Sequence, residues 1–412
     1  MRKEIKKAPT IRFQGFTDEW EQRKLGELAG KTYGGGTPRT SEKTFWNGQV
    51  PWFQSSDLIE DKVLSAIPKK KITEKGLQKS AAQLIPENSI AIITRVGVGK
   101  LAFIPFSYST SQDFLSLSAL NIDGKFGCYS IYKLLQREKN LTQGTSIKGI
   151  TKKELLRKIL WIPCQDEQIK IGRYIANIDN LITLHQRKLD QLKTLKKYFL
   201  QNMFPAKGEK VPRIRFKGFT GDWEQRKVTE LGYIYIGLVT TMTSHYSNHG
   251  TLLIRNSDIK DSCFEFDKKP IFLDEEFAKQ NASRRHQVGD VITVHTGDIG
   301  TSAVITEKEE GSIGFATIVT RPYKEKITSE YLCTYLNTDT HKNFALNIST
   351  GDGRNNYNLK DYYECVVPVP RIKEQIKIAD FINALNNLIT LHQQKLNQLQ
   401  TMKKFMLQNL FI

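Results

Sequence analysis

The stretch at residues 167–204 decides how this chain is organised, and it reads EQIKIGRYIANIDNLITLHQRKLDQLKTLKKYFLQNMF. Apolar residues recur from Ile171 to Met203 at steps that alternate between four and three residues. This spacing predicts one long helix with an apolar face. At about 1.5 Å per residue the helix is expected to be roughly 57 Å long, which exceeds the width of a small domain. Pro163 and Pro205 flank it, as expected for its two ends.

The same stretch occurs a second time, 207 positions later. Residues 374–411 read EQIKIADFINALNNLITLHQQKLNQLQTMKKFMLQNLF, and 24 of the 38 residues are identical. A second duplication precedes each domain: IRFQGFTDEWEQRKLGEL at 11–28 returns as IRFKGFTGDWEQRKVTEL at 214–231. The chain is therefore a tandem duplication, and each half consists of a lead-in segment, a domain and a long helix.

This organisation predicts an α+β fold of four parts. A first domain is expected at 1–163 with its lead-in segment at 11–28, and a long helix at 164–205. A second domain follows at 206–370 with its lead-in segment at 212–231, and a second long helix at 371–412. Apolar runs and turn signals predict mixed α/β domains with twisted sheets, including strands at 89–94 and 159–163 and one or two helical turns at 129–136.

The short connection between the first helix and the second domain constrains the arrangement of the halves. Only residues 205–212 join them, so the second helix is expected to begin where the first one ends. To bury its apolar face it must run back antiparallel, which would hold the two domains apart about an approximate two-fold axis. His185 and His392, at the helix midpoints, are then expected to approach each other near that axis. The alternative is that both are half-buried polar residues tolerated between the helices.

The net charge of +18 indicates a polyanionic partner, and the charge is unevenly distributed. Residues 1–160 hold 27 Lys and Arg against 15 Asp and Glu, whereas residues 211–370 hold 19 against 21. A solvated basic surface is the alternative interpretation of the first excess. If both domains bind nucleic acid, the second must rely on local placement and polar contacts.

Signals for a disulfide framework, a metal site or catalysis are missing from the sequence. The five cysteines are far apart without a CxxC motif, which predicts reduced thiols in a cytoplasm and no metal site. No signal peptide and no apolar run long enough to cross a membrane occur, so no membrane span is expected. Residues 97–100 (GVGK) resemble the end of a phosphate-binding loop but lack its upstream glycine and its Ser or Thr. Neither GxSxG nor HExxH occurs. We therefore expect no catalytic residues.

The chain resembles the specificity subunit of type I restriction–modification systems over essentially its whole length. The resemblance depends on GGGTP at 34–38 followed by VPWFQSSDL at 50–58, on TRVGVGK at 94–100, on the paired WEQRK segments and on the duplicated helices. It implies two target-recognition domains, separated by two antiparallel spacer helices, that read a bipartite target in double-stranded DNA. The helices would set the length of the unread spacer.

The resemblance also implies partners and cofactors. Two copies of a methyltransferase subunit and, in a full complex, restriction–translocase subunits would methylate adenine and cleave DNA. Those partners would use S-adenosylmethionine, ATP and Mg²⁺, and this chain would hold no cofactor itself. The apolar face of each helix is wider than a two-helix seam requires, because Leu181, Leu184 and Leu195 and their copies Leu388, Leu391 and Met402 flank it. We favour partner chains over the domains as the cover for this face.

Polar and basic loop residues are the candidate DNA contacts, because Arg and Lys pair with guanine or phosphate and Gln with adenine. In the first domain the candidates are Thr37, Arg39, Lys43, Gln54, Ser55, Ser56, Arg95, Lys100, Thr145, Ser146 and Lys148. In the second domain they are Thr240, Thr241, Ser244, His245, Arg255, Asn256, His295, Thr296, Asp298, Arg354, Asn355, Asn356 and Tyr357. We predict that Arg354→Ala weakens recognition of one half-site only.

Two other functions remain open at this point. The chain itself could carry methyltransferase or nuclease activity, against which the missing motifs argue. It could also be a scaffold that recruits proteins without reading bases, against which the charge of the first domain and the different loops of the two halves argue.

Overall fold

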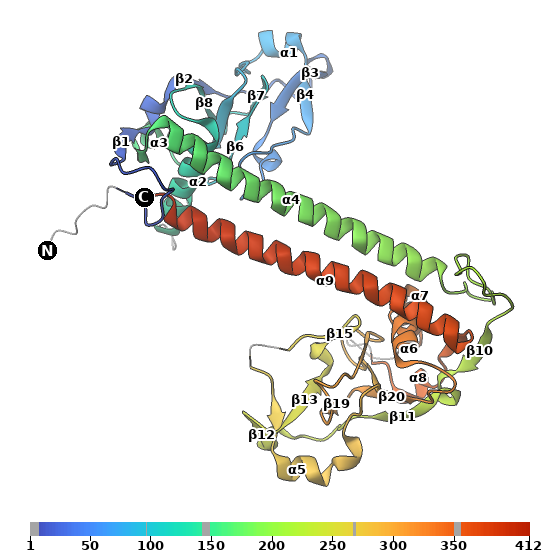
Figure 1. Ribbon diagram of the computed structural model, residues 1–412. Coiled ribbons are helices and arrows are strands. Elements are labelled where there is room, and N and C mark those ends of the chain that lie inside the picture. The colour runs from blue at the N-terminus through green and yellow to red at the C-terminus, as the bar shows by residue number, and fades with distance from the viewer. Residues whose placement is uncertain (1–7, 96, 142–148, 267–268, 350–355) are drawn as a thin grey trace. The chain divides into compact units, whose positions relative to one another are not determined.

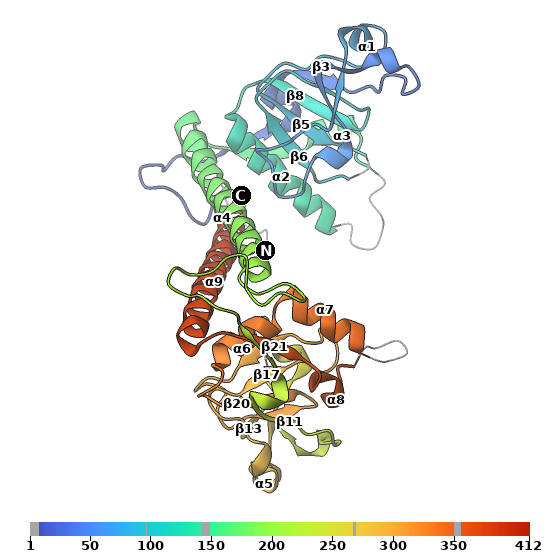
Figure 2. The same ribbon diagram turned by 90° about the vertical axis from the view of Figure 1, so that its right-hand side faces the viewer.

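The computed structural model describes residues 8–95, 97–141, 149–266, 269–349 and 356–412. The chain forms two compact units, the first made of Met1–Gln186 with Gln394–Ile412 and the second of Arg187–Gln393. Each unit contains one domain and a part of each long helix (Figures 1 and 2). The boundaries between the units therefore lie within the helices and not at their ends.

The first unit contains nine strands and three helices besides its parts of the long helices, counted over the described residues. The strands are β1 (Glu21–Lys24), β2 (Ala29–Gly34), β3 (Trp46–Phe53), β4 (Lys70–Ile72), β5 (Ser89–Ile93), β6 (Leu101–Ile104), β7 (Ser109–Thr110), β8 (Phe114–Leu120) and β9 (Ile159–Ile162). The helices are α1 (Glu74–Gln78), α2 (Gly124–Leu141) and α3 (Lys152–Arg157).

The second unit contains a corresponding series of elements. Its strands are β10 (Glu224–Lys227), β11 (Gly232–Ile236), β12 (Tyr246–Ser247), β13 (Thr251–Arg255), β14 (Ile259–Lys260), β15 (Cys263–Phe264), β16 (Phe272–Leu273), β17 (Val291–Thr293), β18 (Ser302–Val304), β19 (Ile313–Phe315), β20 (Ile318–Pro322) and β21 (Val366–Val369). Its helices are α5 (Glu275–Gln280), α6 (Ser329–Leu336), α7 (Asp339–Ile348) and α8 (Leu359–Tyr362).

The two units share their sheet topology, which confirms the predicted repeat and the mixed α/β domains. The larger sheet has the order β2-β8-β5-β6 in the first unit and β11-β20-β17-β18 in the second. Each unit also has a parallel pair of strands, β3 with β7 and β13 with β19. A two-stranded sheet pairs each lead-in strand with the last strand of its domain, β1 with β9 and β10 with β21.

The predicted strand at 89–94 is present as β5, all of whose residues are buried. Ile90 and Ile92 belong to the core cluster that includes α2, whereas Ala91 and Ile93 belong to a second cluster. Burial on both faces explains the uninterrupted apolar run. The prediction of one or two helical turns at 129–136 was too short, because α2 extends over 18 residues. Its first turn is capped by Asp123, whose Oδ1 accepts a hydrogen bond from the Phe126 N–H (2.8 Å).

The long helices are α4 (Gln165–Asn202) and α9 (Ile372–Asn409), of 38 residues each. In the first unit, Arg12 bonds the start of α4 at Glu167, and the neighbouring Ile11 N–H donates to Asn409 O at the end of α9. Further along, Asp179 and Lys403 form an ion pair (2.6 Å). The helix segments of this unit are therefore antiparallel, as predicted.

The second unit repeats this antiparallel pairing with the helices exchanged. Arg215 bonds the start of α9 at Glu374, and the Ile214 N–H donates to Asn202 O at the end of α4. The rings of Phe199 and Phe381 meet edge to face at 4.7 Å. His185 is half-buried in the first unit and His392 in the second, and their approach stays a prediction.

The repeated Glu-Gln pair at the start of each long-helix repeat attaches the helix to its domain. Glu167 is fully buried and accepts two hydrogen bonds from the Arg12 guanidinium (both 2.8 Å). The next residue, Gln168, accepts a hydrogen bond from the Asp123 N–H and donates to Pro163 O. Glu374 and Gln375 make the equivalent contacts in the second unit. These buried contacts explain why the Glu-Gln pair is repeated.

The opposite end of each helix closes an aromatic core. Phe411, just after α9, stacks on Phe126 in the first unit (5.3 Å), beside the buried Trp20. Phe204, just after α4, packs against Tyr331 and Trp223 in the second unit. The tryptophans of the two WEQRK segments are therefore core residues. Within the described residues, no helix is both long and apolar enough to cross a membrane.

Candidate nucleic-acid interface

Backbone hydrogen bonds bring four loop regions of the first domain to one end of its larger sheet. The Gly36 N–H, after β2, donates to Thr110 O, and the Ser111 N–H donates to Phe53 O at the end of β3. The Thr94 N–H, after β5, donates to Asp113 O (2.8 Å), and the Ile150 N–H donates to Thr94 O (2.9 Å). Segments that are far apart in the sequence thus form one continuous surface.

The second domain builds the same surface from the corresponding segments. The Gly237 N–H donates to Thr317 O, and the Tyr357 N–H donates to His295 O. The side chain of Asn256 joins three loops: its Oδ1 accepts from the His295 N–H (2.8 Å) and its Nδ2 donates to Phe315 O and Ala316 O. The scaffold is therefore equivalent in the two domains, while the side chains on it differ.

Five predicted residues of the first domain lie in the loops of this surface. Thr37 and Arg95 are exposed, and Gln54 is half-buried. Thr37 Oγ1 donates to Gln112 Oε1 (2.7 Å), and Gln54 Nε2 donates to Ser56 Oγ (2.9 Å). Ser55 follows Gln54 in the same turn and is half-buried. These side chains offer both donors and acceptors, as base edges in the major groove require.

The remaining described candidates of this domain lie elsewhere. Arg39 and Lys43 are exposed beside the small sheet β4-β3-β7, where Arg39 O accepts a hydrogen bond from Trp46 Nε1 (3.1 Å). Lys100 is half-buried near Glu60, a carboxylate already paired with Lys139 (2.7 Å). Contacts with Lys139 and Lys100 hold the pKa of Glu60 below its usual value. The described candidates of the first domain therefore lie at three places: the loop surface, the small sheet and the vicinity of Glu60.

In the second domain, the exposed candidates lie in two loops. Thr240, Thr241 and Ser244 are exposed after β11, and Asp298 is exposed after β17. The Asp298 carboxylate accepts a hydrogen bond from Thr301 Oγ1 (2.7 Å). His245 is fixed in place, since its Nδ1 lies 2.9 Å from Asp274 Oδ2 and its ring stacks on Phe277 at 4.1 Å.

Five predicted contact residues are hydrogen-bonded within the domain. Arg255 Nη2 is paired with the buried carboxylate of Asp258 (2.7 Å), and the side-chain amide of Asn256 is hydrogen-bonded to backbone groups. Thr296 Oγ1 donates to Asn356 Oδ1 (2.8 Å), and His295 Nδ1 lies 2.7 Å from Thr296 Oγ1. Burial lowers the pKa of His295. These side chains position the loops.

Tyr357 was wrongly predicted as a surface contact. Its side chain is fully buried, and its hydroxyl lies 3.2 Å from His341 Nε2 in the core. Tyr357 is therefore a core residue of the second domain. The candidates Thr145, Ser146, Lys148, Arg354 and Asn355 lie outside the described residues.

The structure adds residues that the sequence did not indicate. Gln112 lies beside Thr37, and the amino group of Lys152 lies over Gly34, where a Cβ atom would be 2.6 Å from it. The Lys70 amino group lies over the rings of Trp46 and Trp52 (5.5 and 5.9 Å). The run Lys69-Lys70-Lys71 was the only sequence signal for this cation–aromatic group.

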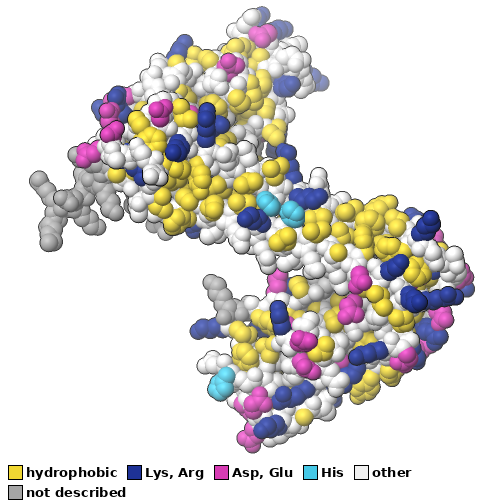
Figure 3. Space-filling model, in the orientation of Figure 1, with side chains coloured by type: hydrophobic (Ala, Val, Ile, Leu, Met, Phe, Trp, Pro, Cys, Tyr) yellow, Lys and Arg dark blue, Asp and Glu magenta, His cyan; other side chains and the backbone are white. Residues whose placement is uncertain are grey.

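The charge balance suits a polyanion better in the first domain, where residues 1–160 hold 27 Lys and Arg against 15 Asp and Glu, than in the second, where residues 211–370 hold 19 against 21. On the face shown in Figure 3, Lys and Arg alternate with Asp and Glu, and hydrophobic side chains lie along the long helices. On the long helices, the side chain of Leu184 is 58% exposed and that of Leu391 is 60% exposed. The described residues contain no cluster of His, Cys, Asp and Glu suited to a metal ion.

Comparisons with known proteins agree with this architecture. A type I restriction–modification specificity subunit of Methanocaldococcus jannaschii (MjaVIII) is 22% identical over 398 residues, 94% of this chain and 91% of that protein. A second one from that organism (MjaIX) is 25% identical over 195 residues, and the match spans only 44% of its length. The crystal structure of an S subunit from M. genitalium superposes with a TM-score of 0.65 over 98% of this chain and 99% of that chain, at 14% identity.

The duplication is also present at the level of the family. The model of the type I restriction modification DNA specificity domain matches twice, at residues 17–194 and 220–401. Each match covers one lead-in strand, one domain and most of one long helix. The two matches together cover well over half of the chain, which therefore belongs to the family of type I restriction–modification DNA specificity subunits.

Proposed function

We propose that this chain reads a bipartite target in double-stranded DNA, with one half-site for each domain and an unread spacer between them. The observation that carries the proposal is the repeated loop surface. In both domains the carbonyl of the residue shortly after the central strand, Thr94 or His295, accepts a hydrogen bond from the backbone N–H of a distant loop residue, Ile150 or Tyr357, whereas the side chains beside them differ. One scaffold with two sets of side chains is what two different half-sites require.

The chemistry on DNA is assigned to partner subunits. Two copies of a methyltransferase subunit would methylate adenine, which must be flipped out of the duplex to reach a catalytic pocket. Restriction–translocase subunits would cleave. S-adenosylmethionine, ATP and Mg²⁺ belong to those partners, and this chain contributes recognition only. The exposed Leu184 and Leu391, one in each unit, support docking of one methyltransferase copy on the helix segments of each unit.

Methylation sequencing of DNA treated with the chain and its methyltransferase partner tests the proposal. The unsubstituted chain should give one bipartite motif. Gln54→Ala should relax or weaken one half of that motif, and Thr241→Ala the other half. Ile67→Ala, at a side chain that is 80% exposed and outside both loop surfaces, is the matched control. Equal effects of the first two variants on both half-sites would contradict assignment of one half-site to each domain, and methylation without any motif would favour a scaffold.

A further inference from the structure

The helix that follows the larger sheet differs between the two units at one buried position. Its register is fixed by equivalent caps: the Asp123 and Thr328 N–H groups each donate to the helix glutamine, Gln168 or Gln375 (both 2.9 Å). Counting seven residues on from these caps, Ser130 in α2 corresponds to Tyr335 in α6. A small hydroxyl side chain in one unit thus stands where the other has a phenol.

In the second unit, Tyr335 spans the space between α6 and β21. Its hydroxyl donates to Val366 O (2.8 Å), and its ring packs against Phe204 at 5.6 Å. The side chain is 6% exposed. Tyr335 therefore satisfies a carbonyl on the free edge of the two-stranded sheet and fills the adjoining apolar space.

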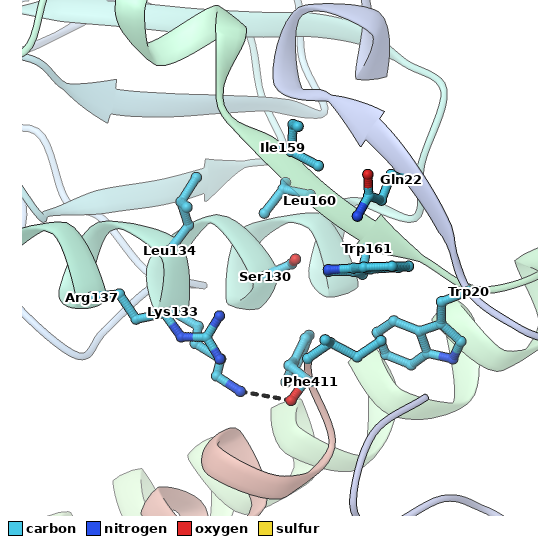
Figure 4. Close-up of a pocket in the computed structure, with 11 residues that line it drawn as sticks. Trp20, Gln22, Ser130, Lys133, Leu134, Arg137, Ile159, Leu160, Trp161 and Phe411 are labelled. Carbon is cyan, nitrogen blue, oxygen red and sulfur yellow. Dashed lines mark hydrogen bonds between the residues drawn. The ribbon is translucent and has the colours of Figure 1, made fainter. Parts of the chain in front are cut away.

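In the first unit, the same place is a cavity of about 230 Å³. Figure 4 shows Ser130, Leu134 and Arg137 of α2 on one side, Ile159 and Trp161 of β9 on another, and Phe411 below. Ile159 is the equivalent of Val366, and its carbonyl points away from β1, because the neighbouring Lys158 O accepts the bond from Leu25. No described side chain bonds the Ile159 carbonyl or Ser130 Oγ.

The lining of the cavity selects an aromatic group with a hydroxyl. Trp161, Trp20 and Phe411 provide aromatic walls, and an apolar cavity of about 150 Å³ is already large enough for benzene. The Ile159 carbonyl offers the acceptor that Val366 offers to Tyr335. The opening of the cavity carries two cationic side chains, Lys133 and Arg137. Lys133 Nζ donates a hydrogen bond to Phe411 O (2.7 Å), whereas no described carboxylate pairs with Arg137.

We propose that this cavity binds the side chain of a tyrosine from a partner subunit, presented beside a carboxylate that pairs with Arg137. A protein side chain is favoured because the second unit fills the equivalent space with its own tyrosine. The cavity also adjoins the end of α9, whose exposed Met402 and Phe405 continue the face assigned above to the methyltransferase. The choice of partner rests on the proposed function, whereas binding of a tyrosyl group does not.

Titration of the full chain with N-acetyl-tyrosine and with N-acetyl-tyrosinamide, followed by the NMR signals of the tryptophan indoles, tests the site itself. Both probes should shift the Trp161 signal, and the carboxylate should bind about two- to fivefold more tightly, the strength of an exposed ion pair. Arg137→Gln should remove that difference. Ser130→Tyr should abolish binding, whereas Ser130→Ala, which keeps the cavity, should not. Absence of binding to the unsubstituted chain would overturn the proposal.

A second variant, which should create a site, keeps the test valid if Ser130→Tyr fails to fold. Tyr335→Ser should open the matching space in the second unit and raise the binding stoichiometry from one to two. The partner is tested by the affinity of the methyltransferase subunit, which Ser130→Tyr should lower at least tenfold and Ser130→Ala should not change. Probe binding with an unchanged methyltransferase affinity would overturn the choice of partner. DNA recognition is tested separately by methylation sequencing, in which loss of one half-site from the motif shows a defect in recognition and not in binding of the methyltransferase.

Discussion

Glu167 and Glu374 show how a single residue can connect an element to its domain. Each carboxylate is buried and takes two hydrogen bonds from an arginine of the IRF motif, more than 150 positions away in the sequence. The same contact raises the pKa of Arg12 and of Arg215. The duplication singled these residues out in the sequence. It could not predict that the arginine pairs with the glutamate, because the two motifs are far apart in the sequence and meet only in the folded chain.

Glu374→Ala should lower the free energy of unfolding of the second unit by about 3 kcal/mol, since it leaves Arg215 beside an empty, buried site. Urea unfolding followed by Trp223 fluorescence measures the loss. Glu224→Ala, which removes an exposed partner of Arg226, is the control and should leave the transition unchanged. A Glu374→Ala transition that coincides with the control would show that the pair contributes nothing.

Two buried histidines should make the second unit sensitive to acid. Burial lowers the pKa of His286 and of His341 to about 4, from about 6.5 in the unfolded chain. Each therefore stabilises the fold fully above pH 6.5, and that stability is lost as the pH falls toward 4. The contribution is on the order of 3 kcal/mol for each residue. The first unit contains only His185, which is half-buried.

Hydrogen exchange measured at pH 7.5 and pH 5 should show amides of the second unit losing protection before those of the first. His341→Gln should reduce the loss, because a glutamine amide can still donate to Leu336 O without taking up a proton. His249→Gln, at an exposed position, serves as the control. Simultaneous loss of protection in both units would refute this explanation.

Among the elements, those with strong periodicity were predicted well. The two long helices begin and end within a few residues of the expected positions, and β5 and β9 lie where apolar runs indicated strands. The length of α2 was missed, because Gly124 and Gly127 weaken the local helix signal while packing of Phe126 and Tyr129 in the core holds the first turns. Tyr357 was missed for a similar reason, since burial depends on distant residues such as His341.

The lengths of α4 and α9 should set the length of the unread spacer in the DNA target. Inserting seven residues after Gln186 and seven after Gln393 adds two turns, about 10.5 Å, to each helix. At about 3.4 Å per base pair, the preferred spacer should lengthen by about three base pairs. Methylation of a library with varied spacers measures the preference. Seven residues inserted at 206–208, outside both helices, should not change it, and an unchanged spacer in the helix variant would contradict the proposed role.

At the scale of the whole molecule, the first unit combines segments from both ends of the sequence, whereas the second unit is one continuous segment. The first unit needs residues 394–412, since Leu410 and Phe411 belong to its core. The duplication predicted two similar halves, but it suggested boundaries at the ends of the helices. The structure divides both helices instead, because each helix end packs against a different domain.

Removing residues 394–412 should therefore damage the first unit, although the deletion is at the opposite end of the sequence. Limited proteolysis should cut the first domain near Trp20 and Phe126, which lose the cover of Phe411. The second unit, which ends at Gln393, should keep its protection. Equal resistance of the two domains in the shortened chain would show that the C-terminal segment is dispensable.

The division of the helices also has a consequence for synthesis on the ribosome. The second unit is complete once residue 393 has emerged from the exit tunnel, whereas the first must wait for the last nineteen residues. The usual vectorial order, in which the N-terminal part folds first, is reversed. We therefore expect the nascent first domain to lack the cover of Phe411 over its aromatic core while more than two hundred further residues are translated, and to bind chaperones that recognise exposed apolar surface during that time.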